Sequence, residues 1–136
     1  MEIIGNGVDI IQNSRIKKLL KNPKFLLRVF SKNEIKASKK IKNKTNFFAK
    51  RFAAKEAFVK SIGTGFRKSI NFNDIYVKNN RLGKPKILFN NKVKNIMVKK
   101  FKSKKFNVFL SLSDEKRYSI AYVIINKLWK KLFLKI

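Results

Sequence analysis

The sequence contains no cysteine and no histidine. A disulfide, a zinc site built on thiolate or imidazole ligands, and general-base catalysis by histidine are therefore excluded. No segment reaches the roughly 18 uncharged apolar residues of a membrane span. The opening stretch MEIIGNGVDIIQ lacks the basic start and long apolar core of a signal peptide. These absences predict a soluble, cytoplasmic protein that is not stably inserted in a membrane.

Acidic residues are also scarce, because seven Asp and Glu stand against 35 Lys and Arg and give a formal net charge of +28. Such a chain attracts polyanions, whether nucleic acid, acidic proteins or phosphorylated cofactors, and charge alone does not choose among them. Lysine, asparagine, isoleucine and phenylalanine are all frequent, so A+T-rich coding also accounts for part of the charge. The length of 136 residues predicts one domain over 1–136, in which 126–136 form a basic, apolar C-terminal extension.

The apolar pattern predicts an α+β protein organised around one helix. The stretch 47–65, FFAKRFAAKEAFVKSIGTG, is apolar nearly all the way round at a helical period, which is typical of a buried helix. Strict alternation predicts a strand over 3–11. The other expected elements are a helix over 13–20 capped by Asn13 or Ser14, a helical piece over 24–40 with a Ser31-x-x-Glu34 capping box, strands over 71–79 and 86–89, a basic helix over 92–100, and strands over 106–113 and 118–125.

The central helix carries one acidic residue, Glu56, four positions before Lys60. When exposed, such a pair is commonly no more than a helical ion pair worth about 0.3–0.5 kcal/mol. In an apolar helix, however, a carboxylate is costly to bury without a cation. The small side chains of Ala49, Ala53 and Ala57 on the same face leave room for a ligand, so Glu56 and Lys60 are candidate site residues.

Three further positions have both a structural and a functional interpretation. Gly63 and Gly65 suit a helix C-cap, because glycine reaches positive φ without strain, and their backbone also lets a phosphate approach Lys60 closely. Asp9 shares a strand face with two glycines, where it is placed to meet a ligand or a metal. An isolated Asp more often caps a helix or a turn, and the sequence leaves both interpretations open.

Four pieces of the chain, in this order and spacing, resemble the holo-acyl-carrier-protein synthases, the small-type 4′-phosphopantetheinyl transferases. They are Gly7-Val8-Asp9-Ile10, Arg51-Phe52-Ala53-Ala54-Lys55-Glu56-Ala57 with Lys60, Gly63-Thr64-Gly65, and Gly83-Lys84-Pro85. The resemblance covers residues 1–125, and the KEA motif with the following lysine and glycine pair is specific. It implies an α+β fold with a small antiparallel sheet wrapped on a long central helix. It also implies a homotrimer whose active sites are each shared between two subunits.

The resemblance further implies an enzyme of fatty acid biosynthesis that transfers 4′-phosphopantetheine from coenzyme A to a serine of apo acyl carrier protein and releases adenosine 3′,5′-bisphosphate. Asp9 and Glu56 would hold a divalent metal, Mg²⁺ or Mn²⁺, on the pyrophosphate, and Lys60 would bind a phosphate oxygen, which makes these three the catalytic residues. Mg²⁺ suits the pair because it prefers hard oxygen ligands and takes few protein carboxylates. The nucleotide-binding residues would be Arg51, Lys60, Gly63, Gly65, Lys84 and Pro85.

Transfer of this kind depends mainly on positioning and on neutralising charge at the transferring phosphorus. The serine proton would leave to a metal-bound water or hydroxide, or to a carboxylate such as Asp9, and we favour the water. Many family members carry a histidine in the penultimate strand near the nucleotide, where this chain has Phe109. That departure bears on nucleotide affinity, and the many lysines would compensate at the 3′-phosphate.

Family members receive the carrier protein on their N-terminal helical region. Here that region is basic, and the expected carrier-binding residues are Arg15, Lys21, Lys24 and Arg28.

A rival interpretation is a small nucleic-acid-binding protein, favoured by the charge and by 13 phenylalanines able to stack on bases. A third is a protein lying on a membrane surface through Trp129 to Ile136. Because most phenylalanines follow core-like spacing, we expect no nucleic-acid partner.

Overall fold

The computed structural model describes residues 1–66 and 69–128. Its elements are β1 (Glu2–Gln12), α1 (Asn13–Leu19), α2 (Pro23–Val29), α3 (Lys32–Ser38), α4 (Lys44–Ile62), the 3₁₀ turn η1 (Phe72–Asp74), β2 (Ile75–Asn79), β3 (Pro85–Phe89), α5 (Asn91–Phe101), β4 (Phe106–Asp114) and β5 (Tyr118–Lys127). The expected α+β class is confirmed. The sequence rightly predicts α4, α5 and every strand to within a few residues, apart from the start of β2.

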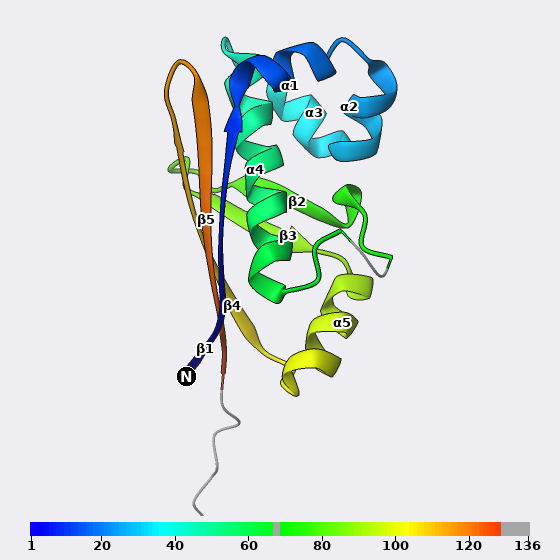
Figure 1. Cartoon of the computed structure of the whole chain (residues 1–136), viewed down its shortest axis with the longest axis vertical. Coiled ribbons are helices and arrows are strands. Elements are labelled where there is room, and N and C mark those ends of the chain that lie inside the picture. The colour runs from blue at the N-terminus through cyan, green and yellow to red at the C-terminus, as the bar shows by residue number, and fades with distance from the viewer. Residues whose placement is uncertain (67–68, 129–136) are drawn as a thin grey trace, which may run out of the picture.

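The strands form two antiparallel sheets. β1, β5 and β4 pair in that order, and β2 pairs with β3 as a separate hairpin. Figure 1 shows α4 lying along one face of the three-stranded sheet, with α1 to α3 gathered at one end of the molecule and α5 at the other. Since α4 is covered on several sides, it places the side chains of the candidate site relative to every other element.

Helix α4 forms because both of its ends are capped and its apolar side chains are packed on several sides. The Asn43 side chain accepts a hydrogen bond from the Asn46 amide, and Gly63 ends the helix in the left-handed region at φ 78°. Fourteen of its 19 residues are buried, which confirms the predicted buried helix. Its start at Lys44 is three residues earlier than expected, because the asparagine cap lies outside the apolar run.

The helical piece expected over 24–40 is in fact two helices, α2 and α3. Phe30 between them is extended, at φ −112° and ψ 140°. The Ser31 hydroxyl accepts from the Glu34 amide while the Glu34 carboxylate accepts from the Ser31 amide, so the predicted capping box is confirmed. A capping box begins a helix, and the chain therefore turns before Ser31.

Three local predictions were wrong. The α1 N-cap is Gln12, without a side-chain cap bond, because Asn13 donates instead to the carbonyls of Glu115 and Lys116. The first residues of the strand expected over 71–79 form η1, capped by hydrogen bonds between Asn71 and Asp74. β5 continues to Lys127, so 126 and 127 belong to the sheet. The rest of the expected extension, from Trp129 on, lies outside the described residues.

The face of the three-stranded sheet opposite α4 is apolar and exposed. Val8 pairs with Tyr122 and Ile10 with Ile120 across β1 and β5, and these four side chains are all solvent-exposed. Phe109 on β4 is exposed by 53%. A connected apolar face of this kind on one chain is typical of a surface that another protein covers. We call these five residues the outer sheet face.

Candidate active site

Asp9 points from β1 toward α4 and meets Lys60. The Lys60 ammonium donates to Asp9 Oδ1 at 3.1 Å and to the Val8 carbonyl at 3.1 Å. Asp9 lies within the strand, opposite Ala121, so the interpretation as a helix or turn cap is wrong. Its side chain is 16% exposed whereas that of Lys60 is 54% exposed. The pair therefore sits at the surface end of a buried strand–helix contact.

The glycines before Asp9 let β1 approach the α4 backbone. A Cβ on Gly5 would lie 2.0 Å from the Ser61 carbonyl oxygen, and one on Gly7 would lie 2.0 Å from that of Ala57. Real side chains do not tolerate such contacts, so only glycine allows this spacing. The close approach brings Asp9 to within hydrogen-bond reach of Lys60 on α4.

Glu56 lies on α4 near Asp9. Burial raises the pKa of Glu56, and the neighbouring Asp9 carboxylate raises it further, while Lys60 and Arg15 oppose the shift. Burial likewise raises the pKa of Asp9, against the effect of Lys60 and Arg15. A carboxylate whose charge is disfavoured by a neighbouring carboxylate is placed to share a cation with it.

The plain helical ion pair between Glu56 and Lys60 does not form, because Lys60 is bonded to Asp9 instead. The prediction that the small alanines leave room for a ligand is also wrong. Ala53 and Ala57 are fully buried, and the backbone of Gly7 packs on Ala57. The small side chains therefore make room for a strand.

The turn after α4 is built as a helix C-cap. Gly63 and Gly65 both have positive φ, and the amides of Gly63, Thr64 and Gly65 all point at the Val59 carbonyl. The Lys100 ammonium, from α5, donates to the Ile62 carbonyl at the same helix end. The predicted glycine cap is confirmed. The cap lies one turn beyond Lys60, and the approach of a phosphate to Lys60 along these glycines stays a prediction.

A pocket of about 390 Å³ opens on the other side of α4. Its lining residues are Lys50, Arg51, Asn79, Gly83, Lys84, Pro85, Leu110, Ser111 and Leu112. Three of the predicted nucleotide-binding residues, Arg51, Lys84 and Pro85, meet here. Lys50 and Asn79 were missed by sequence reasoning, because no local motif indicates that they face β4. The resemblance placed the penultimate strand near the nucleotide, and β4 lines this pocket through Leu110, Ser111 and Leu112, whereas Phe109 is exposed on the outer sheet face.

Arg51 is the most buried cation of the pocket, at 4% exposure. Its guanidinium carbon lies 3.5 Å from the centre of the Phe47 ring, and its Nη2 donates to the Asn79 side chain at 3.4 Å. Burial lowers its pKa to about 10, so it remains cationic at neutral pH. Its Nε has no hydrogen-bond partner, which leaves a donor for a ligand.

The predicted site residues thus fall into two groups on one chain. Asp9, Glu56 and Lys60 lie where β1 crosses α4, whereas Arg51 and Lys84 line the pocket beside β4. Glu56 is five positions after Arg51 on α4, which turns the two side chains ~140° apart around the helix. β5 also lies between β1 and β4, so the two groups face different sides of the chain.

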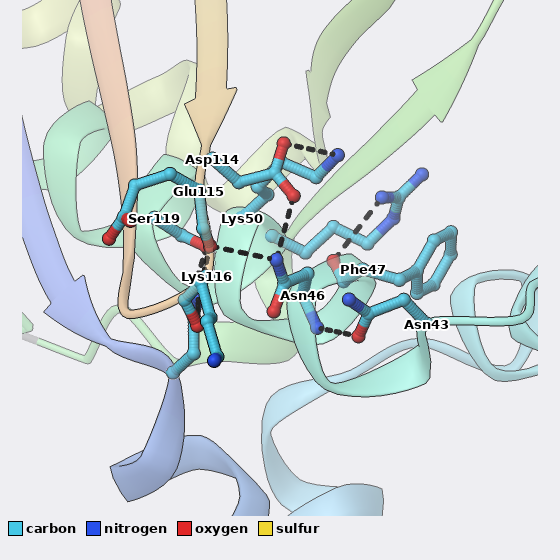
Figure 2. Close-up of polar contacts among 10 residues, drawn as sticks. Asn43, Asn46, Phe47, Lys50, Asp114, Glu115, Lys116 and Ser119 are labelled. Carbon is cyan, nitrogen blue, oxygen red and sulfur yellow. Dashed lines mark hydrogen bonds and ion pairs between the residues drawn. The ribbon is translucent and has the colours of Figure 1, made fainter.

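The turn between β4 and β5 is tied to the start of α4 by polar contacts that the sequence did not reveal (Figure 2). Asn46 donates to the Asp114 carboxylate at 2.9 Å and to the Glu115 carbonyl at 3.1 Å. Lys50, on the rim of the pocket, pairs with Asp114 at 3.3 Å. These contacts tie the end of β4 to α4 beside the pocket.

The four residues expected to bind the carrier protein are all exposed and lie on or between α1 and α2: Arg15, Lys21, Lys24 and Arg28. Arg15 is also close enough to Asp9 and Glu56 to lower the pKa of each. A basic surface therefore begins beside the two carboxylates.

Within the described ranges, no group of three or more potential metal-ligating side chains occurs, and no helix is long and apolar enough to cross a membrane.

Five phenylalanines lie in the core, at positions 30, 47, 48, 52 and 58. Among the described phenylalanines only Phe109 is exposed. The described phenylalanines therefore do not form the row of exposed rings among lysines on which the nucleic-acid alternative depends.

Residues 5–123 match the model of the 4′-phosphopantetheinyl transferase superfamily. The chain belongs to this family. Within it, the chain is 59% identical over 127 residues to the holo-[acyl-carrier-protein] synthase of Pelagibacter ubique, covering 93% of this chain and 99% of that protein. It is 51% identical over 128 residues to the enzyme of the same name from Ehrlichia chaffeensis, covering 90% and 96%.

Solved structures agree with these sequence relatives. The fold is similar to a holo-(acyl-carrier-protein) synthase from Bacillus anthracis in complex with CoA (3′,5′-ADP), with a TM-score of 0.77, 37% identity, and coverage of 93% of this chain and 98% of that one. It is also similar to the holo-[acyl-carrier-protein] synthase of Neisseria meningitidis, with a TM-score of 0.80, 32% identity, and coverage of 93% and 100%.

Proposed function

We propose that this protein is a holo-acyl-carrier-protein synthase, which transfers 4′-phosphopantetheine from coenzyme A to a serine of apo acyl carrier protein. The observation that carries the proposal is the meeting of Asp9, Glu56 and Lys60 at the crossing of β1 and α4, in a chain 59% identical to a holo-acyl-carrier-protein synthase. The setting supports chemistry on a pyrophosphate, because it combines two neighbouring carboxylates with a half-exposed cation.

The carboxylate pair fits a divalent metal of the Mg²⁺ type. Both ligands are hard oxygens, Asp9 disfavours the charge on Glu56, and no third acidic ligand is gathered with them among the described residues. Mg²⁺ usually keeps few protein carboxylates and completes its shell with phosphate oxygens and water. Asp9 and Glu56 would hold it, or Mn²⁺ in its place. When bound, it would neutralise charge on the pyrophosphate.

The chain's own residues account for the rest of the transfer. The carrier serine oxygen forms a bond to the phosphorus that bears pantetheine, and the bond from that phosphorus to the leaving phosphate oxygen breaks. Adenosine 3′,5′-bisphosphate leaves, and the serine proton passes to water or to Asp9. Lys60, which is half-exposed and already donates to Asp9, would turn to a phosphate oxygen, where a fixed cation stabilises developing charge.

The pocket beside β4 would bind the nucleotide part of coenzyme A. Its volume of about 390 Å³ suits a small ligand. Arg51 contributes an unpaired Nε donor and Lys84 a second cation, while Pro85 gives an apolar edge. Gly63 and Gly65, with Lys60, would receive the phosphates at the end of α4.

We further propose a homotrimer in which each active site combines two subunits. The carboxylate group and the nucleotide pocket face different sides of one chain, so a single ligand joins them most simply across a subunit boundary. The outer sheet face supplies an apolar surface for that association. Sedimentation velocity should give a trimer, and a stable monomer at micromolar concentration would contradict this assembly.

The exposed cations of α1 and α2, Arg15, Lys21, Lys24 and Arg28, would receive the acidic carrier protein. Charge complementarity steers encounter and fixes orientation more than it adds affinity. Arg15 supports this placement because it lies between the basic surface and the carboxylates. A carrier serine delivered there arrives beside Asp9.

The direct test is mass spectrometry of apo acyl carrier protein incubated with this protein, coenzyme A and Mg²⁺. We expect a phosphopantetheine adduct with the native chain. Asp9→Ala and Glu56→Gln should abolish it while leaving circular dichroism unchanged, and Glu2→Gln serves as the matched carboxylate control. No adduct with the native chain would overturn the function. Near-normal transfer by Glu56→Gln would overturn its assignment as a metal ligand.

A further inference from the structure

A buried ion pair lies outside the site described above. Glu34, on α3, and Lys55, on α4, meet at 2.7 Å with side chains that are 1% and 0% exposed. Burial lowers the pKa of Lys55, while the Glu34 carboxylate opposes the shift. Charged groups are rarely buried this completely unless hydrogen bonds satisfy them.

Every partner of the pair comes from a different element. The Lys55 ammonium also donates to the Val29 carbonyl at the end of α2, at 2.6 Å. Glu34 Oε1 accepts from the Ser31 amide at 2.9 Å, and Oε2 accepts from the Val77 amide of β2 at 3.1 Å. One ion pair thus joins α2, α3, α4 and β2 through main-chain groups.

Such a pair contributes little net stability. Removing two charges from water costs several kcal/mol per ion, and well-packed apolar residues of similar volume often replace a buried pair without loss. The pair instead fixes the relative positions of the four elements. Its hydrogen bonds are directional, and all of them form in only one arrangement of α2, α3, α4 and β2. A purely apolar contact would allow those elements to slide.

The four elements carry the three parts of the proposed site. Lys55 immediately precedes Glu56 on the helix of the carboxylate group. Val77 is two residues from Asn79, which lines the nucleotide pocket and accepts from Arg51. Val29 follows Arg28 on α2, the proposed carrier-docking helix.

We propose that Glu34 and Lys55 are positioning residues, which hold the docking helices and the pocket hairpin in fixed relation to the catalytic face of α4. This inference rests on the proposed transferase function. Neither side chain reaches the substrates; both act through Glu56, Asn79 and the α1–α2 surface. Because misplacement by about 1 Å can cost roughly 100-fold in rate, loss of the pair should impair turnover in a chain that is still folded.

The test compares the double variant Glu34→Leu with Lys55→Met against the matched double variant Glu2→Gln with Lys127→Met, which removes the surface pair between β1 and β5. Transfer to carrier protein is measured well below the melting temperature of each protein. We expect the first variant to stay folded but to melt below the native chain, because the Ser31 and Val77 amides and the Val29 carbonyl lose their partners. Its kcat/KM should fall by about tenfold to 100-fold. The surface control should keep native kinetics.

Amide hydrogen exchange gives a readout that does not depend on activity. The Val77 amide should exchange faster in the Glu34→Leu, Lys55→Met variant by more than the change in global stability accounts for. If that variant does not fold, Glu34→Gln replaces it. Glutamine keeps the volume of Glu34 and one acceptor oxygen, while its amide nitrogen cannot accept from the Ser31 or the Val77 amide, so one main-chain tie is lost. A folded variant with native kcat/KM would overturn the positioning role. Lack of transfer by the native chain would overturn the proposed function instead.

Discussion

Lys60 neutralises one of the two carboxylates that we propose as metal ligands, so its replacement should affect turnover and metal binding in opposite directions. In Lys60→Met, the hydrogen bond to Asp9 Oδ1 is lost, and the metal no longer competes with an ammonium. Mn²⁺ binding without coenzyme A, followed by electron paramagnetic resonance, should tighten. Turnover should fall by roughly 100- to 1,000-fold, the usual cost of removing a group that stabilises transition-state charge.

Lys99→Met, an exposed lysine on α5, is the control for the loss of one positive charge. If Lys60→Met changed only the melting temperature and left both metal binding and turnover alone, its bond to Asp9 would be a purely structural contact. The substitution therefore distinguishes two roles of Lys60: binding the substrate, or only joining α4 to β1 through Asp9.

The raised pKa values of Asp9 and Glu56 predict how stability depends on pH. A carboxyl whose folded-state pKa is raised contributes stability that is fully present below its unfolded value of about 4 and is lost as pH rises through the folded value. Burial is the main cause for both groups. In Glu56→Gln this loss should be smaller, so urea unfolding should show the variant gaining stability relative to the native chain between pH 4 and neutrality.

A constant difference between the two proteins over that pH range would contradict the raised pKa of Glu56. Metal should be left out of these measurements, because it would favour the charged carboxylates. Asp74 provides an internal contrast, since hydrogen bonds from Lys92, Asn71 and Asn90 outweigh its burial and lower its pKa. Its stabilising contribution is lost as pH falls through the folded value.

At the scale of elements, the contact between β1 and α4 sets the position of Asp9. In Gly7→Ala, the added methyl would overlap the Ala57 carbonyl oxygen and crowd the Ser61 amide, so β1 must move away from the helix. Overpacking of this kind typically costs about 1–3 kcal/mol. We expect lower stability in urea unfolding and a further loss of transfer in the folded fraction, because Asp9 moves with the strand.

Asn6→Ala, on the exposed side of the same strand, is the matched control and should leave both properties near native. Native transfer by Gly7→Ala would mean that the spacing between β1 and α4 does not position Asp9.

The sequence predicts those elements whose signals are local. The α4 apolar run, the Ser31 and Glu34 capping box and the glycine cap are all readable within a few residues, and all are confirmed. The break between α2 and α3 was missed although the predicted capping box at Ser31 marks it, because a capping box begins a helix. η1 was missed because its caps, between Asn71 and Asp74, resemble strand-end residues.

The candidate site divides in the same way. Asp9, Glu56 and Lys60 were predicted from motif positions, and the structure brings them together. The role first given to the small alanines was wrong, since packing against glycine cannot be seen in either segment alone. Lys50, Asn79 and Asp114 enter the pocket region only through contacts between distant strands and α4.

At the scale of the whole molecule, the basic surface on α1 and α2 should act mainly on association. Reversing Arg28, which is exposed on α2, to Glu should raise the KM for carrier protein several-fold and leave the KM for coenzyme A nearly unchanged. The effect should shrink with salt, because the Debye length is about 8–10 Å at physiological ionic strength.

Arg15→Glu should do at least as much, whereas Lys99→Glu, equally basic but on α5, should do much less. Equal losses from all three reversals would mean that the net charge of +28 attracts the carrier without a specific docking face. Steady-state kinetics at two salt concentrations distinguish these outcomes.

The placement of carboxylates and pocket on different sides of α4 has a genetic consequence. Glu56→Gln subunits lack a carboxylate but keep the pocket, whereas Lys84→Glu subunits keep the carboxylates and lose a pocket cation. Each homotrimer alone should be inactive. Co-expressed, the two defective chains should complement one another, since random mixing would pair an intact pocket with intact carboxylates at about one quarter of the shared sites. Two alleles that each fail alone would then sustain growth together.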